Sequence, residues 1–429
     1  MLSRRGSGSR IIGLLDLGSS KICCAIVERT EPAGPDGAAQ LRLLGLGQQR
    51  SDGIRNGMVV DLDRAEPCVS RAIGAAEEQA GVTLDSVTVA VTNLRLASAH
   101  FSAHLDLIDG TVGSEDLKRI GARAREYAER NGSSLIFLDR IHYTLDGAVG
   151  IRSPLNMIGQ RLSCQYHAVT ADPAHLRNLE ALIERCYLSV DGFVPAGYAS
   201  AIAATTSDER QYGVIAVDIG AGATKIAVIA DDRFLYTDTL ALGGAYLTHD
   251  VAAKLSTTLS EAERIKTLYG TLVNARSDQY SAVAYWRAEE NGLVGYRAAQ
   301  GEQQETTRAE LSRILYPRAR HQLELIRERI ERNPVMRDLA QSIVLTGGAC
   351  QLAGFPALAG DILGRRVRIG SPEVATSSSS PFASPAMSTI VGLGLSDVQA
   401  ADQANLHGVQ GRVSNTYLSR MEQWLRESF

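Results

Sequence analysis

The sequence predicts an α/β protein with two related lobes, an α+β subdomain inserted into the first lobe, and an amphipathic helix at the C-terminal end. Three observations lead to this prediction. A strand, an Asp-x-Gly turn and a second strand occur at 11–27 and again at 214–230. A later strand, at 343–345, ends in Thr-Gly-Gly, and residues 415–429 have helical amphipathic periodicity. Because a repeated unit of this kind is typical of internal duplication, we expect two lobes of the same design.

The composition excludes several classes of protein. The 429 residues are enough for about three domains. Lysine and arginine number 44 against 48 aspartate and glutamate residues, a net charge of −4, so we expect no nucleic-acid partner. The six cysteines are scattered without a C-x-x-C pair, which favours neither a zinc site nor a disulfide framework. Residues 1–9 lack the apolar run of a secretory signal, and a cytoplasmic location is expected.

The first lobe is expected to open with a hairpin, because the apolar runs 11–15 and 22–27 flank the first turn. A Pro/Gly-rich loop at 31–39 and a helix at 65–80 follow, and a strand at 86–91 is predicted to open the inserted subdomain. In the inserted subdomain, strands are predicted at 97–107, 135–145 and 161–170. A helix is predicted at 114–129, since Glu115 and Asp116 stand in its first turn. A helix at 173–187 leads back to the first lobe.

The second lobe is expected to begin with strands at 214–217 and 226–230. A long polar helix is predicted at 312–331, which Pro317 should kink or start. The serine run 377–380 reads as a loop. The chain is predicted to begin with a flexible N-terminus (1–9) and the first lobe (10–84 and 167–212), which is interrupted by the insertion (85–166). The second lobe follows (213–245) with its outer subdomain (246–332), and 333–395 carries the adenosine motif of the second lobe and returns to the first lobe. A flexible linker (396–414) and the amphipathic helix (415–429) end the predicted division.

The turns carry residues suited to phosphate. Gly18 and Gly220 lack side chains, so backbone N–H groups can approach phosphate oxygens closely. Asp16 and Asp218 are candidates to hold Mg²⁺ through its water shell. A plain hairpin with a solvated aspartate explains either turn alone, but two matching turns and a third Gly-Gly turn favour a nucleotide site. Ser19, Ser20 and Thr224 add hydroxyl groups.

Several stretches resemble a known family. They are GGAYLTHD at 243–250, AERIKTLYG at 262–270, LTGGA at 345–349 and the spacing within 143–170. With the three turns in this order, the chain resembles the actin, sugar-kinase and heat-shock-chaperone superfamily. Within that superfamily it is similar, over about 10–395, to the FtsA family of bacterial cell-division actin homologues.

The resemblance implies an actin-like two-lobed ATPase fold, with ATP in the cleft between the lobes. It implies that Glu263 and Lys266 flank the ribose and adenine, although a surface ion pair explains the same spacing. The adenosine pocket would be lined by Gly347, Gly348 and Ala349. The residues expected at the phosphates are Gly18, Ser19, Ser20, Lys21, Gly220, Gly222 and Thr224.

Two departures from the family pattern bear on hydrolysis. Lys225 stands where relatives often have an acidic residue. Val194 stands where the chaperone branch has a catalytic carboxylate. No residue is evident that would orient an attacking water, a requirement of phosphoryl transfer to water. We therefore expect at most weak ATPase activity.

The C-terminal segment 415–429 places its large apolar side chains on one arc of a helix. Such a helix either docks on the protein's own core or lies in the plane of a phospholipid membrane. The preceding polar linker and the family resemblance favour the membrane. The side chains predicted to enter the membrane are Leu418, Met421, Trp424, Leu425 and Phe429.

The resemblance also implies a function: a protein that polymerises at the inner face of the cytoplasmic membrane, at the division septum, and tethers the FtsZ ring there. Self-assembly into filaments and the recruitment of later division proteins belong to the same expectation. The outer subdomain is expected to bind the C-terminal peptide of FtsZ, with Arg318 and Gln322 as candidate contacts. The alternatives are a small-molecule, sugar-type kinase and a chaperone-like ATPase of the same superfamily.

Overall fold

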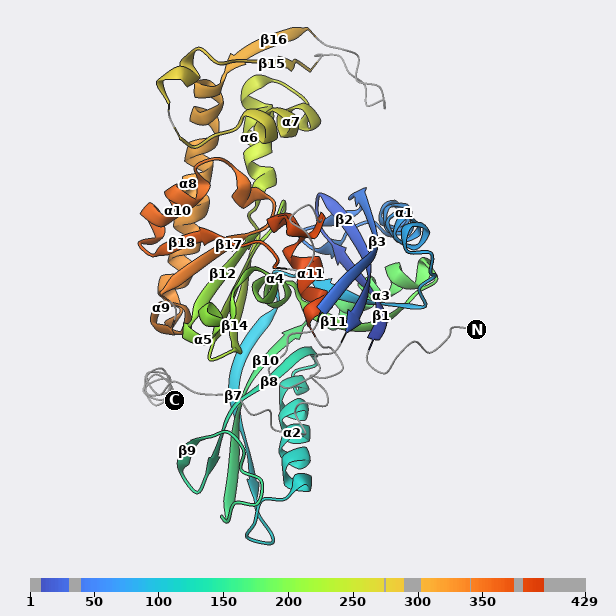
Figure 1. Cartoon of the computed structure of the whole chain (residues 1–429), viewed down its shortest axis with the longest axis vertical. Helices are drawn as coiled ribbons and strands as arrows, with labels where there is room; N and C mark the ends of the chain where they lie inside the picture. The colour runs from blue at the N-terminus through green and yellow to red at the C-terminus, as the bar shows by residue number, and fades with distance from the viewer. Residues whose placement is uncertain are drawn as a thin grey trace.

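The computed structural model describes residues 9–30, 40–273, 275–288, 302–339, 341–373 and 381–396. Two five-stranded sheets form the centre of the molecule. Figure 1 shows the inserted subdomain at one end and the β15–β16 region at the opposite end, with the two sheets between them.

The two sheets have the same topology. In the first lobe the strand order is β11-β6-β1-β2-β3, and in the second it is β14-β13-β12-β17-β18. In each, one antiparallel hairpin continues into a third antiparallel strand on one side and two parallel strands on the other. The predicted duplication is therefore confirmed. The strands are β1 (Ser9–Leu17), β2 (Lys21–Thr30), β3 (Gln40–Arg50), β6 (Ser86–Val91), β11 (Ser189–Pro195), β12 (Val214–Ile219), β13 (Thr224–Ala230), β14 (Arg233–Leu240), β17 (Ser342–Thr346) and β18 (Arg366–Ile369).

Helix α1 (Leu62–Ala80) covers the first sheet together with α3 (Pro173–Arg185). It begins three residues before the predicted start because Asp61 caps it, accepting a hydrogen bond from the backbone N–H of Arg64. Gly47 lets β3 pass close beneath the helix, since a Cβ there would overlap the carbonyl oxygen of Ala72. A short hairpin, β4 (Ile54–Arg55) and β5 (Met58–Val59), precedes α1.

Two short, largely buried helices, α4 (Ala196–Ala204) and α11 (Ser388–Leu395), cross between the lobes. Gly392 permits this contact, because a Cβ there would collide with the carbonyl of Ala199. Helix α4 packs on β12 and β13, and α11 packs on β1 and β2. The pair therefore packs between the two sheets and joins them.

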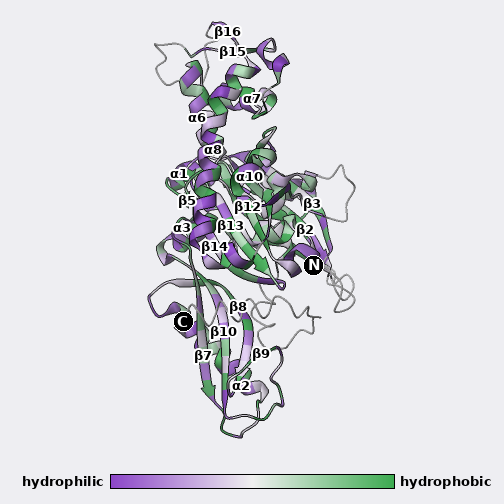
Figure 2. Cartoon of the chain, turned by 90° about the vertical axis from the view of Figure 1, so that its left-hand side faces the viewer, coloured by the Kyte–Doolittle hydropathy of each residue, from purple (hydrophilic) through white to green (hydrophobic). Residues whose placement is uncertain are grey.

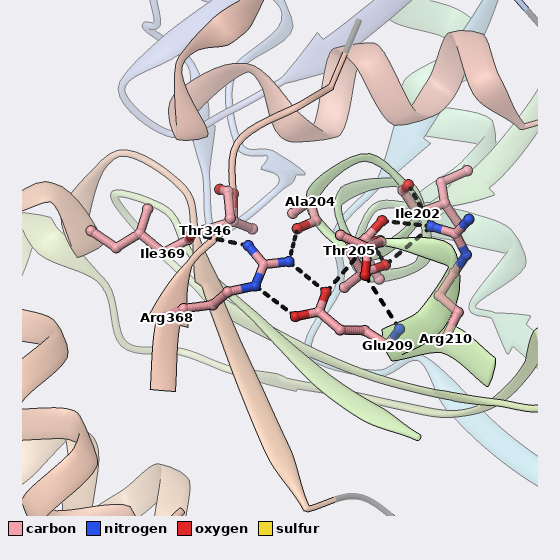
Figure 3. A network of polar contacts seen from close by, with 11 residues as sticks. Ile202, Ala204, Thr205, Glu209, Arg210, Thr346, Arg368 and Ile369 are labelled. Atoms are coloured by element: carbon pink, nitrogen blue, oxygen red, sulfur yellow. Dashed lines mark hydrogen bonds and ion pairs between the residues drawn. The ribbon is translucent and has the colours of Figure 1, made fainter. Parts of the chain in front are cut away.

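A polar network ties the end of α4 and helix α5 (Ser207–Tyr212) to the second sheet (Figure 3). Arg368 on β18 donates from Nε to Glu209 at 2.6 Å and from Nη2 to the carbonyl of Ala204 at 3.1 Å. Arg210 donates to the carbonyl of Thr205 at 2.6 Å. These contacts fix the chain that passes from the first lobe to the second.

The insertion is a four-stranded sheet, in the order β7-β10-β8-β9, covered by one helix. Its predicted bounds, 85–166, were wrong, because β6 pairs within the first-lobe sheet and β10 runs to Ala171. It also contacts strand β14 of the second lobe. The backbone N–H of Thr237 donates to Ser98 Oγ at 3.2 Å, and Arg233 pairs with Asp139 at 3.3 Å. The elements are β7 (Ala97–Asp106), α2 (Ser114–Glu129), β8 (Ser134–Leu145), β9 (Ala148–Ile151) and β10 (Arg161–Ala171).

Histidine residues lie at this junction. His167 is fully buried, its ring 5.0 Å from those of His100 and Phe234. Burial and the neighbouring His100 lower the pKa of His167 to about 3, and burial lowers the pKa of His100 to about 4. When the pH is below the ordinary histidine pKa, the unfolded chain therefore binds protons at these two histidines, whereas the folded chain does not. Stability consequently falls as the pH drops from about 6.5 towards 4.

The variant His167→Gln removes one of these titrating groups. We expect the loss of stability between pH 7 and pH 5, measured by urea unfolding, to be shallower than in the wild type, by up to about 1.4 kcal/mol per pH unit. His249→Gln, at an exposed position on α6, serves as the control. Equal slopes for wild type and His167→Gln would contradict this assignment.

The outer part of the second lobe contains α6 (Gly244–Leu255), α7 (Leu259–Tyr269), β15 (Ala282–Trp286), β16 (Gln303–Thr307) and the long helix α8 (Arg308–Arg332). The predicted start of α8 was wrong. Thr307 caps the helix by accepting from Glu310 N–H, so α8 begins at Arg308 and runs through Pro317. Two further helices, α9 (Pro334–Leu339) and α10 (Phe355–Leu363), complete this lobe.

The most hydrophobic strands lie in the buried core of the second lobe. In Figure 2, β12 and β13 are largely hydrophobic, whereas α8 carries hydrophilic stretches. Every residue of β12 and β13 is buried. Among the described residues, no helix is long and apolar enough to cross a membrane. The predicted loops 31–39 and 377–380, the linker from 397 onward and the helix 415–429 lie outside the described residues.

Candidate functional site

The two Asp-x-Gly turns have the same backbone geometry. In the first, Gly18 N–H donates to the carbonyl of Lys21 at 3.1 Å, and in the second, Gly220 N–H donates to the carbonyl of Ala223 at 3.0 Å. Each turn closes a hairpin that joins the middle strand of its sheet to an antiparallel neighbour. The sheets thus present two equivalent turns.

The two turns meet across the lobes. A Cβ added to Gly222 would lie 2.5 Å from Ser19 Oγ and 2.7 Å from Asn56 Oδ1. Asn56, between β4 and β5, donates its backbone N–H to Ser19 Oγ at 2.9 Å. A side chain at position 222 would therefore displace the Ser19 and Asn56 side chains. Asn56 was not predicted, because an asparagine in a turn gives no further signal in the sequence. Its φ of 51° is one that asparagine tolerates in turns.

Backbone donors remain available in both turns. Within the described part of the chain, the N–H groups of Ser19, Ser20, Ala221 and Gly222 donate to no protein acceptor. Successive free N–H groups in tight turns attract anions. The pair of turns therefore fits the phosphate chain of a nucleotide.

The third turn lies against the second. Gly347 has a φ of +87°, and a Cβ there would overlap Oδ1 of Asp218. The N–H of Gly347 donates to the carbonyl of Pro385 at 3.1 Å, which joins the third turn to the segment Pro385–Met387 before α11. Beside it, a Cβ on Gly244, at the start of α6, would lie 2.8 Å from that of Ala349.

The predicted pair Glu263 and Lys266 lies next to this turn. Lys266 Nζ is 2.7 Å from Glu263 Oε2, 2.8 Å from Thr248 Oγ1 and 3.2 Å from the carbonyl of Gly244. Burial alone would raise the pKa of Glu263, but hydrogen bonds from Lys266 and Thr248 hold it below its ordinary value. The glutamate side chain is 55% exposed, so it faces the cleft or solvent.

The structure therefore brings most of the predicted nucleotide residues into one continuous region. From the first lobe it places Gly18, Ser19 and Ser20, with Lys21 Nζ 3.3 Å from the carbonyl of Ala386. From the second lobe come the second and third turns and the Glu263–Lys266 pair. The neighbours in this region are Gly18, Ser19, Ser20, Lys21, Gly220, Gly222, Gly244, Glu263, Lys266, Gly347, Gly348 and Ala349.

Two predicted residues do not reach the positions assigned to them. Thr224 is fully buried; its hydroxyl donates to the carbonyl of Leu242 at 2.6 Å and accepts from Gln322 Nε2 at 3.1 Å. It therefore supports the turn from beneath and does not face a phosphate. Gln322 is 1% exposed, so it is not available to a peptide. Both assignments are corrected to internal structural roles.

Arg318 remains at the surface but already has a partner. Its Nε and Nη2 donate to the two carboxylate oxygens of Asp250 at 2.7 and 2.9 Å. The arginine side chain is 34% exposed. An acidic ligand would have to approach its Nη1 edge.

A charged cluster lies beneath the turns. Lys225 Nζ is 2.7 Å from Asp218 Oδ2, which also accepts from Thr389 Oγ1 at 3.1 Å. Burial raises the pKa of Asp16, an effect that Lys225 and Lys21 oppose and Asp218 reinforces. Two carboxylates and two ammonium groups, one of each from either lobe, therefore interact in one place.

This cluster does not fit a protein-held Mg²⁺ ion. Mg²⁺ requires oxygen ligands in near-octahedral geometry. The ammonium group of Lys225 already engages Asp218, one of the two carboxylates predicted to hold Mg²⁺ through its water shell, and would repel a divalent cation beside it. Across the described residues, no group of three or more His, Cys, Asp or Glu is placed to hold a metal. The predicted membrane residues Leu418, Met421, Trp424, Leu425 and Phe429 lie outside the described part of the chain.

The family comparisons match both halves of the chain. A model described as "Cell division protein FtsA" matches residues 215–392, and one described as "SHS2 domain inserted in FTSA" matches residues 94–170. Cell division protein FtsA of Rhizobium meliloti (strain 1021) is 37% identical over 98% of this chain and 95% of its own length. The protein of the same name from Escherichia coli (strain K12) is 29% identical over 99% of this chain and 100% of its own.

Solved structures share the fold. A chain of the PilM–PilN type IV pilus biogenesis complex has a TM-score of 0.59 at 18% identity, covering 93% of this chain and 99% of its own. MreB5 of Spiroplasma citri, in a crystal structure bound to ADP, has a TM-score of 0.51 at 12% identity, covering 90% and 94%. The fold is therefore the actin-like one.

Proposed function

The chain belongs to the FtsA family of cell division proteins, and on that premise we propose that it binds ATP between its lobes and assembles into filaments on the inner face of the cytoplasmic membrane. At the division septum it tethers the FtsZ ring to the membrane and helps to recruit later division proteins. Attachment to phospholipid is through the segment 415–429. The inserted subdomain contributes to self-assembly.

The observation that carries the ATP proposal is the convergence of the three glycine turns. The first two turns touch at Ser19 and Gly222, and the third touches the second at Asp218 and Gly347. The free N–H groups of Ser19, Ser20, Ala221 and Gly222 then bind the phosphates. Gly348 and Ala349, with Glu263 and Lys266, border the adenosine. MreB5, of the same fold, was crystallised bound to ADP, which supports a nucleotide in this place.

The proposal does not include Mg²⁺ held by Asp16 and Asp218, because Lys225 engages Asp218. Nor does it require rapid hydrolysis. Val194, at the end of β11, is 5% exposed within the apolar core and offers no carboxylate to the cleft. ATP then acts as a ligand that stabilises the assembled, closed form of the protein.

A reconstitution tests the membrane and partner parts together. We expect FtsZ to sediment with phospholipid vesicles when the full-length chain and ATP are present, and to remain in the supernatant when either is omitted. Arg318→Glu is expected to weaken FtsZ recruitment by about tenfold, since charge-assisted hydrogen bonds to an acidic peptide are lost. The control is Arg320→Glu, which makes the same charge change on the same helix at a side chain 56% exposed.

The outcomes separate the parts of the proposal. If FtsZ stays in the supernatant while the chain sediments, the tethering function is wrong. If Arg318→Glu and Arg320→Glu both recruit FtsZ at wild-type strength, Arg318 does not belong to the peptide site.

A further inference from the structure

The buried ion pair of Lys225 with Asp218 joins neighbouring strands of the second hairpin. The two residues are register partners in β12 and β13, so their side chains emerge on the same face of the sheet. Residue exposures are 9% for Lys225 and 3% for Asp218. The distance from Nζ to Oδ2 is 2.7 Å, and Thr389 of α11 donates to the same carboxylate oxygen. Asp218 is thus held by groups from both lobes.

The face on which Lys225 lies is the one that the three turns cover. Asp218 touches the third turn, because a Cβ on Gly347 would overlap its Oδ1. The turn that follows Asp218 touches Ser19 of the first lobe. Asp16, at the same position in the first hairpin, interacts with Lys225 across the lobes. The lysine therefore lies beneath the point where the three turns converge.

The ammonium form of Lys225 is stabilised there. Its Nζ lies 2.7 Å from Asp218 Oδ2, and Asp16 of the first lobe carries a second carboxylate that attracts it. An ammonium group has three donors. Asp218 takes one of them, which leaves donors for Asp16 and for a phosphate oxygen entering between the turns.

Divalent cations in nucleotide sites offset phosphate charge and orient phosphate oxygens. Lys225 supplies a positive charge from the protein, next to the carboxylates predicted to hold Mg²⁺. We infer that Lys225 is the resident cation of the phosphate site, so that this chain binds ATP tightly without a divalent metal. The inference rests on the proposed ATP site and deepens it.

The test is calorimetric titration of ATP into the full-length chain, in excess EDTA and in excess Mg²⁺. Wild-type affinity is expected to differ by less than about threefold between the two conditions. Lys225→Met, which keeps the stem and removes the charge, is expected to lose about tenfold or more of its affinity in EDTA. Added Mg²⁺ is expected to restore part of that loss. Lys254→Met, at an exposed position on α6, should bind as the wild type does in both conditions.

Lys225→Met leaves the Asp218 carboxylate buried without its cation, so a second variant guards against misfolding. Lys225→Met/Asp218→Asn removes both charges, and its thermal unfolding is compared with that of the wild type. Loss of affinity in EDTA by this folded variant supports the inference.

The outcomes of these titrations distinguish the role of Lys225 from the existence of the ATP site. Wild-type binding that requires Mg²⁺, or wild-type affinity in EDTA for the double variant, overturns the role of Lys225 and leaves the ATP site standing. No binding by the wild type in either condition overturns the ATP site itself, and the inference with it.

Discussion

Trp424→Glu is expected to release the full-length chain from phospholipid vesicles without changing its affinity for ATP. The substitution places a charge in the middle of the apolar arc formed by Leu418, Met421, Trp424, Leu425 and Phe429. Burial of one large apolar side chain contributes roughly 1.5–3 kcal/mol when complete. Burial at an interface is partial, and ordering the segment into a helix costs entropy, so a single segment binds weakly.

Filaments amplify this effect. When one segment of an assembled filament is bound, the next binds at a high effective concentration. A substitution that weakens each segment modestly therefore has a large effect on the filament. The charges of 415–429 cancel, with two arginine and two glutamate residues, so salt should change the binding little.

The matched control is Gln423→Glu, which adds the same charge on the polar arc. Vesicle co-sedimentation at equal protein concentration compares the two variants. We expect Gln423→Glu to sediment with lipid and Trp424→Glu to stay in solution. Equal sedimentation of both would show that the segment is not the anchor, and a helix docked on the protein's own core would then explain its pattern.

Gly222→Val is expected to weaken ATP binding by at least about tenfold. A Cβ at this position already meets Ser19 Oγ and Asn56 Oδ1, and the two further methyl groups of valine force the turns apart. Overpacking of this kind costs about 1–3 kcal/mol, and here that cost falls on the closed arrangement of the lobes that ATP requires. The affinity for ATP should therefore fall by at least about tenfold.

Gly360→Ala on α10 is the control, because nothing lies within 4 Å of a Cβ at that position. Its ATP affinity should equal that of the wild type. A folded Gly222→Val variant that binds ATP normally would place the phosphates away from the contact between the first two turns.

The two lobes were predictable because the sequence repeats the unit that organises each sheet. The turn geometry followed for the same reason: Asp, Gly and an apolar strand on either side leave few alternatives for a tight hairpin. The insertion was recognisable from alternation and from the acidic first turn of α2. The start of α8 was predicted wrongly because the first residues of the helix are largely polar and show no apolar periodicity. The cap, Thr307, lies before these residues.

The orientation of single side chains was harder to predict. Thr224 and Lys225 are consecutive in β13 and so point to opposite faces. Lys225 shares its face with Asp218, its register partner, which turns Thr224 away from the cleft towards Gln322 on α8. Counting the hairpin register from the turn would have revealed this, whereas hydroxyl chemistry alone suggested the opposite.

Gln322 is a second residue whose side-chain orientation was predicted wrongly, in this case on a helix. It lies on the buried stripe of α8 with Leu315, Ala319 and Ile326, at the spacing of an inward face. Its polar side chain suggested a surface contact, but its position in the stripe indicates burial. The structure resolves the conflict by pairing its amide with Thr224.

The most direct test of the central claim is a structure of the full-length chain with a non-hydrolysable ATP analogue at saturating concentration. The account predicts the phosphates against the N–H groups of Ser19, Ser20, Ala221 and Gly222, with a phosphate oxygen within hydrogen-bond distance of Lys225 Nζ. It places the adenosine beside Gly348 and Ala349. A nucleotide bound elsewhere on the chain, or an empty cleft with the three turns unchanged, would contradict it.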